Sequence, residues 1–309
     1  MFLGIDTGFG YTKVVSDNEK LIFKTIVEPF VKTERQTKSP IFVNGKGYLV
    51  GPDTLSDMQV SKDFFGSDEY YALIGYCLKH FQEKGVKIDG IGLSIPPGMY
   101  NEKKIAVFKY QLGRSEIIYN KDHIIVPEKI EFYSQGAGAY FDFLKNNPLY
   151  ADKGVIVIDI GYYTIDFVFF NKGEGYDELF RSYPLGVEVI LRKIIDEITV
   201  RYGEFISLEM AELILKTGTF RFLGKEYKID HMEYIDNFYI PKVIKTIKEY
   251  GNIIKNYRLN LKENEDIVVV LAGGGAVYLQ NRFDDVFVLN DPQFANARGI
   301  KIYMEKFFQ

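Results

Sequence analysis

The sequence lacks several residues that would point to particular classes of protein. It has no tryptophan, and Cys77 is its single cysteine, which excludes an intrachain disulfide and a metal site built from several cysteines. The three histidines, His80, His123 and His231, are far apart, and none has the spacing of a metal-ligand pair. We therefore expect these histidines to be ordinary surface or packed residues.

An excess of positive charge and long apolar runs are also missing. The net charge is −4 at pH 7, so the overall charge does not favour direct DNA binding. The longest uncharged apolar run, 267–279, is too short to span a bilayer and contains three glycines. The first residues have neither the basic start nor the apolar stretch of a signal peptide. We expect a cytoplasmic protein with no membrane partner.

The chain does contain enough residues for two domains. It has 309 residues, of which 47% are hydrophobic and 26% are charged, as in ordinary globular proteins. Hydrophobic periodicity and turn residues predict an alternation of strands and helices. The predicted strands are 2–5, 11–15, 21–27, 41–43, 48–50, 91–95, 154–158, 164–170, 179–183, 267–271 and 286–289. The predicted helices are 70–84, 102–112, 135–144, 186–202, 208–216, 241–255 and 293 to the end, with a further helix directly after residue 275.

One local pattern occurs twice. Ile5-Asp6-Thr7-Gly8 ends a buried strand and leads through a turn into a second apolar strand, and Ile158-Asp159-Ile160-Gly161 does the same. The two copies begin 153 positions apart, which is about half the chain. An Asp before a Gly at a strand end is a common turn when it stands alone. Two matching hairpins half a chain apart instead indicate two like domains.

The residue types in these hairpins suit the phosphates of a nucleotide. Lys13 can neutralise a phosphate as a point charge, and the hydroxyls of Thr12 and Thr164 are further donors. Asp6 and Asp159 supply one carboxylate from each domain, which is the kind of ligand that Mg²⁺ takes beside phosphate oxygens and water. Glycines let backbone N–H groups approach a phosphate closely, and the hairpins contain Gly8, Gly10 and Gly161.

A third glycine-rich element lies between the strand 267–271 and the helix expected after it. Its three consecutive glycines, Gly273, Gly274 and Gly275, let a flat ring or a ribose lie against the backbone. The N-terminus of the expected helix would favour a nearby phosphate. The element is neither a Walker A loop nor a dinucleotide fingerprint. A tight turn from strand to helix is the alternative interpretation.

The order of these segments resembles the five-part ATPase signature of the superfamily of actin, sugar kinases and heat-shock chaperones. The matching segments, called phosphate 1, connect 1, phosphate 2, adenosine and connect 2, are Asp6–Lys13, Gln135–Ala139, Asp159–Asp166, Gly273–Ala276 and Asn296–Gly299. Within that superfamily the chain looks most like bacterial and archaeal actin-like proteins of the plasmid-segregation (ParM-like) type.

This resemblance implies an α/β actin-like fold, in which two ribonuclease-H-like domains flank a nucleotide cleft. The first domain would comprise residues 1–152, with a C-terminal helix at 291–309 packing back on it. The second domain would comprise residues 153–290.

The resemblance also implies roles for individual residues. Gln135 would position the attacking water, and Asp159 would share the catalytic role beside the magnesium ion that it holds with Asp6. Lys13 would bind phosphate, and Glu212 would meet the ribose or the base. Tyr11 and Tyr162, which lie in the two phosphate hairpins, complete the cofactor-binding set with the hairpin glycines, the hairpin threonines and Gly273 to Gly275.

One residue departs from the family pattern. Tyr162 stands where many relatives have a second glycine in phosphate 2. The side chain is expected to narrow the cleft and to weaken the phosphate contact of this loop.

As a function, the resemblance implies an ATPase that binds Mg-ATP, or GTP, and forms nucleotide-dependent filaments of its own chain. Hydrolysis would be slow because Gln135 is a poor base. Plasmid DNA segregation through a DNA-bound adaptor protein is the expected role. Two alternatives stay open: a small-molecule (sugar-type) kinase of the same superfamily, and an actin-like assembly protein that does not polymerise.

Overall fold

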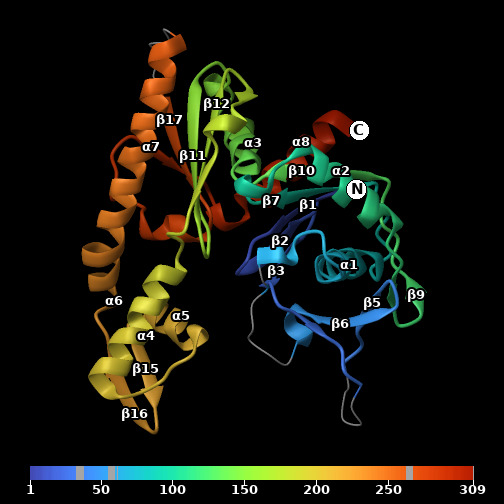
Figure 1. Cartoon of the computed structure of the whole chain (residues 1–309), viewed down its shortest axis with the longest axis horizontal. Helices are drawn as coiled ribbons and strands as arrows, with labels where there is room; N and C mark the ends of the chain where they lie inside the picture. The colour runs from blue at the N-terminus through green and yellow to red at the C-terminus, as the bar shows by residue number, and fades with distance from the viewer. Residues whose placement is uncertain (33–37, 55–59, 61, 262–266, 309) are drawn as a thin grey trace.

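Two mixed β-sheets, one in each half of the chain, form the framework of the computed structural model (Figure 1). The structure describes residues 1–32, 38–54, 60, 62–261 and 267–308. The first sheet has the order β10-β7-β1-β2-β3, with β1 at Phe2–Thr7, β2 at Tyr11–Val15, β3 at Lys20–Lys24, β7 at Gly90–Ile95 and β10 at Lys129–Ser134. In the second sheet the order is β13-β12-β11-β17-β18, and β14 also pairs with β12. Its strands are β11 (Gly154–Ile160), β12 (Ile165–Asn171), β13 (Glu174–Gly175), β14 (Arg181–Tyr183), β17 (Ile267–Ala272) and β18 (Val286–Val288).

The two sheets repeat one arrangement at their centres. β1 is antiparallel to β2 and parallel to β7, and β11 is antiparallel to β12 and parallel to β17. Asp6 lies opposite Lys13 in the first hairpin, and Asp159 lies opposite Asp166 in the second. The sequence repeat is therefore a structural repeat, with one carboxylate at the same place in each hairpin.

Two helices connect the halves by crossing between the sheets. α3 (Ala137–Asn146) follows the first sheet in sequence but packs its buried face on strands of the second sheet. α8 (Ala295–Phe308) follows the second sheet and packs on β1 and β7 of the first (Figure 1). The helices touch at glycines: a Cβ on Gly299 would lie 1.7 Å from the carbonyl oxygen of Gly138. Because no larger residue fits this contact, the crossing fixes how the two sheets sit relative to each other.

A smaller antiparallel sheet and two helices complete the first half. The sheet has the order β4-β6-β5-β8-β9, and α1 (Asp68–Gln82) covers it and shares a core with the first sheet. Asn44 and Gly45 join two strands of this sheet and both have positive φ, 51° and 82°, as a two-residue hairpin turn requires. The remaining elements are β4 (Val27–Pro29), β5 (Ile41–Val43), β6 (Lys46–Val50), β8 (Ile117–Tyr119), β9 (Asp122–His123) and α2 (Glu102–Arg114).

Helices dominate the rest of the second half. α7 (Ile240–Leu261) and α4 (Glu188–Tyr202) pack on the second sheet through the apolar core of this half. α5 (Leu208–Thr217) and the hairpin of β15 (Thr219–Phe222) and β16 (Lys225–Lys228) follow α4. A short α6 (His231–Glu233) and a π-helical turn at Tyr234–Tyr239 lead into α7. Within the described residues, no helix combines the length and the apolar character that crossing a bilayer needs.

The single-turn 3-10 helices lie mainly at the ends of these elements. Their bounds are Gly51–Asp53, Lys62–Phe64, Pro97–Met99, Pro148–Tyr150, Asp177–Leu179, Gly274–Tyr278 and Pro292–Phe294.

Most predicted elements are present, but some boundaries differ and several elements were not predicted. The unpredicted elements are β8, β9, β10, β13, the β15–β16 hairpin and α6. The predicted strand 21–27 is divided into β3 and β4, and the predicted strand 179–183 is shortened to β14. The helix predicted from Gln135 begins at Ala137, because Gly136 has a φ of 89°, which an α-helix does not allow. The helix predicted after Gly275 is only a 3-10 turn, Gly274–Tyr278. The domain boundaries at 152/153 and 290/291 stay a prediction.

Candidate functional site

A cavity of about 670 Å³ lies between the two sheets and is lined by residues from both halves of the chain. It contains both repeated aspartates and nearly every other predicted site residue. From the first half these are Asp6, Gly8, Gly10, Tyr11, Lys13 and Gln135. From the second half they are Asp159, Gly161, Tyr162, Thr164, Glu212, Gly273, Gly274 and Gly275.

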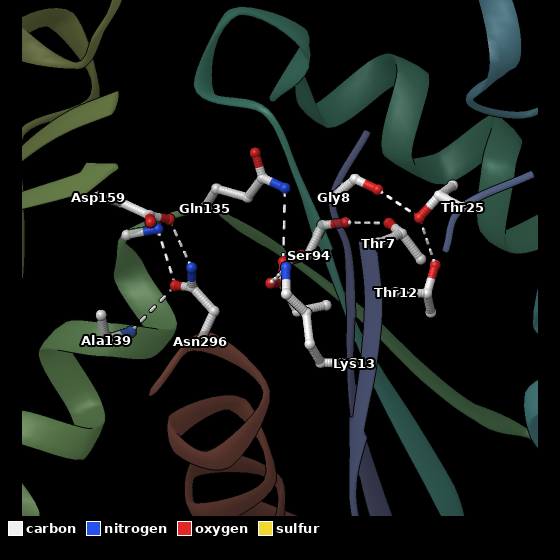
Figure 2. Close-up of polar contacts among 12 residues, drawn as sticks. Thr7, Gly8, Thr12, Lys13, Thr25, Ser94, Gln135, Ala139, Asp159 and Asn296 are labelled. Carbon is white, nitrogen blue, oxygen red and sulfur yellow. Dashed lines mark hydrogen bonds and ion pairs between the residues drawn. The ribbon is translucent and has the colours of Figure 1, made fainter. Parts of the chain in front are cut away.

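Asp6 is held at the cavity wall through both carboxylate oxygens. Oδ2 pairs with the ammonium of Lys13 at 2.7 Å, and Oδ1 accepts hydrogen bonds from the hydroxyl of Ser94 and, at 3.4 Å, from the amide of Gln135 (Figure 2). Ser94 lies at the end of β7, directly beside Asp6 in the parallel register. A buried carboxylate is stable when its oxygens are paired in this way, so Lys13, Ser94 and Gln135 together fix the position of Asp6.

On the other side of the cavity, Asp159 is held by a residue of the C-terminal helix. The side-chain amide of Asn296 donates to Oδ2 of Asp159 at 2.6 Å. Its carbonyl oxygen accepts from the backbone N–H groups of Gly136 at 2.9 Å and of Ala139 at 3.2 Å (Figure 2). Burial, reinforced by the negative charge of Asp6, raises the pKa of Asp159 to about 6. The two aspartates therefore act on each other across the cavity.

Asp166 is a further carboxylate in this wall, and it was not among the predicted site residues. It occupies the register position in the second hairpin that Lys13 occupies in the first. Its Oδ2 accepts from the hydroxyl of Thr164 at 3.0 Å, whereas Oδ1 is buried and has no partner among the described residues. Burial, reinforced by the charge of Asp159, raises the pKa of Asp166 to about 7. The first hairpin thus presents a carboxylate and an ammonium, and the second presents two carboxyl groups.

The prediction that Thr12 donates to a ligand differs from the structure. Successive side chains of a strand point to opposite faces, so Tyr11 and Lys13 face the cavity while Thr12 is buried on the other side. The hydroxyls of Thr12 and Thr25 are 2.8 Å apart, and Thr25 donates its proton to the carbonyl oxygen of Gly8. Thr12 is therefore the donor to Thr25. These two threonines support the turn at Gly8 through the hydrogen bond to its carbonyl oxygen (Figure 2).

Tyr162 fills the space between the two hairpins. A Cβ on Gly10 would lie 2.6 Å from the Cγ atom of its ring, so this ring rests against the backbone of the first hairpin. Next to it, the rings of Phe9 and Tyr163 meet edge to face with centroids 5.5 Å apart. The two hairpins therefore touch each other directly, at the position where a relative with glycine would leave a gap.

The glycine-rich element passes closely behind Asp159. Gly273 has a φ of 81°, and a Cβ there would lie 2.2 Å from Oδ1 of Asp159. Because the following residues form only a 3-10 turn, the helix N-terminus predicted here as an aid to phosphate binding is absent. The glycines instead form part of the cavity wall with backbone atoms alone.

Comparison with known proteins agrees with this architecture. The model of the family "Actin like proteins N terminal domain" matches residues 4–138, and that of "Archaeal actin homologue MreB-like, C-terminal" matches residues 157–285. The chain belongs to the actin-like proteins. Among curated proteins, no sequence matches it.

Solved structures of actin homologues share the whole fold. The archaeal actin homologue Ta0583 superposes with a TM-score of 0.78 at 22% identity, covering 99% of both chains. Its complex with ADP gives a TM-score of 0.72 at 22% identity, again over 99% of both chains. A ParM from a 15-stranded filament of Clostridium botulinum gives 0.69 at 21% identity over 99% of both chains. These likenesses confirm the predicted α/β actin-like fold with two domains.

The actin-like cavity continues beyond the predicted residues. Its wall also includes side chains that no motif pointed to, among them Leu215, Lys216, His231, Met232, Ile235, Val277, Tyr278 and Arg282. His231, expected to be an ordinary surface or packed residue, is therefore part of the cavity wall. No local pattern could predict this, because α6, which contains His231, belongs to none of the motifs that meet at the cavity.

A divalent cation with phosphate oxygens fits the near end of this actin-like cavity. Asp6 and Asp159 are buried carboxylates on opposite walls, and hard cations prefer such oxygen ligands. The described residues contain no group of three or more His, Cys, Asp or Glu side chains arranged to hold a metal ion. A cation here would therefore take most of its ligands from phosphate and water, as Mg²⁺ usually does.

Proposed function

We propose that this actin-like chain binds Mg-ATP in the cavity between its two domains, hydrolyses it slowly and forms nucleotide-dependent filaments. One observation carries the proposal. Asp6 and Asp159, from two repeated hairpins, face a single cavity that also contains Lys13, Gln135 and the glycines 273–275. This combination offers a cation and backbone donors to phosphates and carboxylates to a metal ion. The ADP complex of Ta0583 supports a nucleotide as the ligand.

In this proposal the first hairpin is the main phosphate site. Lys13 exchanges its pairing with Asp6 for a phosphate oxygen, because a nucleotide brings more negative charge than one carboxylate. Gly8 and Gly10 let the backbone of the turn approach the phosphates. Gly161 and Thr164 face them from the second hairpin, where Tyr162 leaves less room.

Asp6 and Asp159 would hold the Mg²⁺ ion, largely through water molecules. When bound, Mg²⁺ neutralises charge on the phosphates. Asn296 keeps Asp159 oriented toward the cavity, and Ser94 does the same for Asp6.

Gln135 would position the attacking water. Its Nε2 points to Oδ1 of Asp6, which leaves its Oε1 to accept a hydrogen bond from the water. An amide orients water without removing its proton. Turnover should therefore be slow and depend on how the two domains close.

Filament formation is proposed from solved relatives. Solved relatives include the ParM filament of Clostridium botulinum and an Alp12 filament, each with 99% of this chain covered. A plasmid-segregating filament would reach DNA through a DNA-bound adaptor protein, because the chain has a net charge of −4.

Light scattering, pelleting and phosphate release, measured together after adding Mg-ATP or Mg-GTP, test the proposal. We expect scattering and pelleted protein to rise with nucleotide and phosphate to be released slowly. An Asp6→Asn variant should lose phosphate release, and Asp284→Asn, at an exposed position, should behave as the wild type.

The same assays separate the alternatives. Transfer of phosphate to a sugar without polymer would replace the proposal with a kinase. Nucleotide binding without polymer or turnover would indicate a non-polymerising assembly protein. Binding of the purified chain alone to plasmid DNA would contradict the proposal that the filament reaches DNA through an adaptor protein.

A further inference from the structure

The two domains are also bridged by two pairs of polar side chains, one of which lines the cavity. Tyr11 on β2 and Lys24 on β3 are direct partners in the strand register. They face Glu212 and Glu209, which lie one turn apart on α5. The hydroxyl of Tyr11 donates to Oε2 of Glu212 at 2.8 Å, and Lys24 forms an ion pair with Glu209. Adjacent residues of one domain thus meet adjacent residues of the other.

Of the two pairs, only Tyr11 with Glu212 faces the main cavity. Both residues line it. Lys24 and Glu209 do not, but they line a small hollow of about 100 Å³, and Glu212 lines that hollow too. Burial and the bond to Glu212 raise the pKa of Tyr11, so the phenol keeps its proton and remains the donor. Oε2 of Glu212 is thereby occupied. Oε1 has no hydrogen bond to the described residues and is available to a ligand.

A carboxylate oxygen at this point selects for a ligand that donates hydrogen bonds. It repels phosphate, which must stay near Lys13. Tyr11 and Lys13 point to the same face of β2, with Cα atoms about 7 Å apart. The part of a nucleotide next to the phosphates is the sugar, and its hydroxyls are donors.

We propose that Tyr11 is a positioning residue for sugar recognition: its hydroxyl, reaching across the cleft, holds Glu212 so that Oε1 accepts a hydrogen bond from a ribose hydroxyl. The inference rests on the proposed nucleotide function. The resemblance to the family already implied a contact of Glu212 with the ribose or the base; the new part is that Tyr11, from the other domain, orients Glu212 for it. Sugar recognition therefore depends on the cleft being closed at this point.

Binding of ATP, 2′-deoxy-ATP and 3′-deoxy-ATP, measured by calorimetry with Mg²⁺, tests the inference. We expect the wild type to bind ATP about tenfold more tightly than at least one deoxy analogue, as for a hydrogen bond to a charged group. Tyr11→Phe should bind ATP several-fold more weakly and the deoxy analogue about as well as the wild type. The preference should then fall to about twofold. Glu212→Ala should show no preference, and adding Tyr11→Phe to it should change nothing further.

Lys24→Met is the matched control. It removes the other bridge between the same strand pair and the same helix but leaves Glu212 untouched, so it should keep the tenfold preference. If Lys24→Met loses the preference for ATP over the deoxy analogue as Tyr11→Phe does, the loss is due to general loosening of the cleft, and the positioning role of Tyr11 is wrong. Thermal unfolding without nucleotide checks that each variant is folded.

The failures are distinguishable. A wild type that binds no nucleotide overturns the proposed function, and the inference with it. A wild type that binds ATP and both deoxy analogues equally overturns the inference alone. An unchanged preference in Tyr11→Phe shows that Glu212 does not need Tyr11.

Discussion

Asn296 and Asp159, which are 137 residues apart in the sequence, share a hydrogen bond of 2.6 Å in the centre of the molecule. The same Asn296 side chain accepts hydrogen bonds from the first backbone groups of α3. One amide thus connects a cavity carboxylate of the second sheet with both crossing helices. In this way the orientation of Asp159 depends on how the two helices cross, which links the cavity to the arrangement of the domains.

Replacing Asn296 should therefore affect stability as well as nucleotide binding. Asn296→Ala leaves one carboxylate oxygen and two backbone N–H groups without their buried partner, so we expect the free energy of unfolding to fall by about 2–4 kcal/mol. Urea unfolding measures this. Asn252→Ala, at an exposed position within α7, should be neutral or slightly stabilising. Equal stability of the two variants would mean that the Asn296 network contributes nothing.

The carboxyl pair of the second hairpin predicts a pH dependence. The ordinary pKa of an aspartate is 3.8, and that of Asp166 is raised to about 7, mainly by burial. Between these values the folded chain binds a proton that the unfolded chain has released, so stability falls as pH rises through this window. Asp159, with a pKa raised to about 6, contributes in the same direction.

Asp166→Asn removes the group that binds this proton, so the stability of the variant should depend less on pH. Without nucleotide, the wild type should lose more than about 1 kcal/mol relative to Asp166→Asn between pH 5 and pH 7. Thermal or urea unfolding at several pH values measures the difference. Asp284→Asn, at an exposed position, should follow the wild type at every pH. Parallel curves for the wild type and Asp166→Asn would show that Asp166 does not hold a proton.

The parts of the site that sequence could predict are those specified by local pattern. Asp6 and Asp159 could be paired because strand, turn and glycine follow one another directly in each hairpin. The burial of Thr12 away from the cavity could also have been predicted, since it follows from the alternation of side chains along β2. The prediction that Thr12 donates to a ligand did not take this alternation into account.

The parts that could not be predicted depend on which distant elements meet. Ser94 supports Asp6 only because β7 pairs with β1 in that register, and Asn296 reaches Asp159 only because α8 crosses α3. The residues after Gly273 form a 3-10 helix where an α-helix was predicted, at a place where a Cβ on Gly273 would lie 2.2 Å from Oδ1 of Asp159. Secondary-structure propensity cannot predict such contacts, because they form only when distant elements pack together.

Gln135 is the residue on which the proposed hydrolysis depends. Gln135→Ala should keep nucleotide binding within a fewfold and lower phosphate release by about 10- to 100-fold, since the water loses its orientation. Gln280→Ala, at an exposed position, is the control. Unchanged turnover in Gln135→Ala would remove Gln135 from this role, while loss of binding would make it a ligand contact.

Gly273 offers the sharpest test of how the cavity is built. Gly273→Ala combines a positive φ with a methyl group 2.2 Å from Oδ1 of Asp159. Gly85→Ala has a similar φ of 74° but meets nothing within 4 Å. The difference between the two variants therefore measures the close contacts at Gly273, which are those with Oδ1 of Asp159 and, at 2.4 Å, with the backbone oxygen of Ile160. The positive φ alone should cost about 1 kcal/mol in both. We expect Gly273→Ala to lose several-fold more nucleotide affinity than Gly85→Ala, because only there must the carboxylate move. Equal nucleotide affinity in the two variants would mean that Asp159 can shift without affecting the ligand. The proposal that Asp159 lies beside the phosphates would then be wrong.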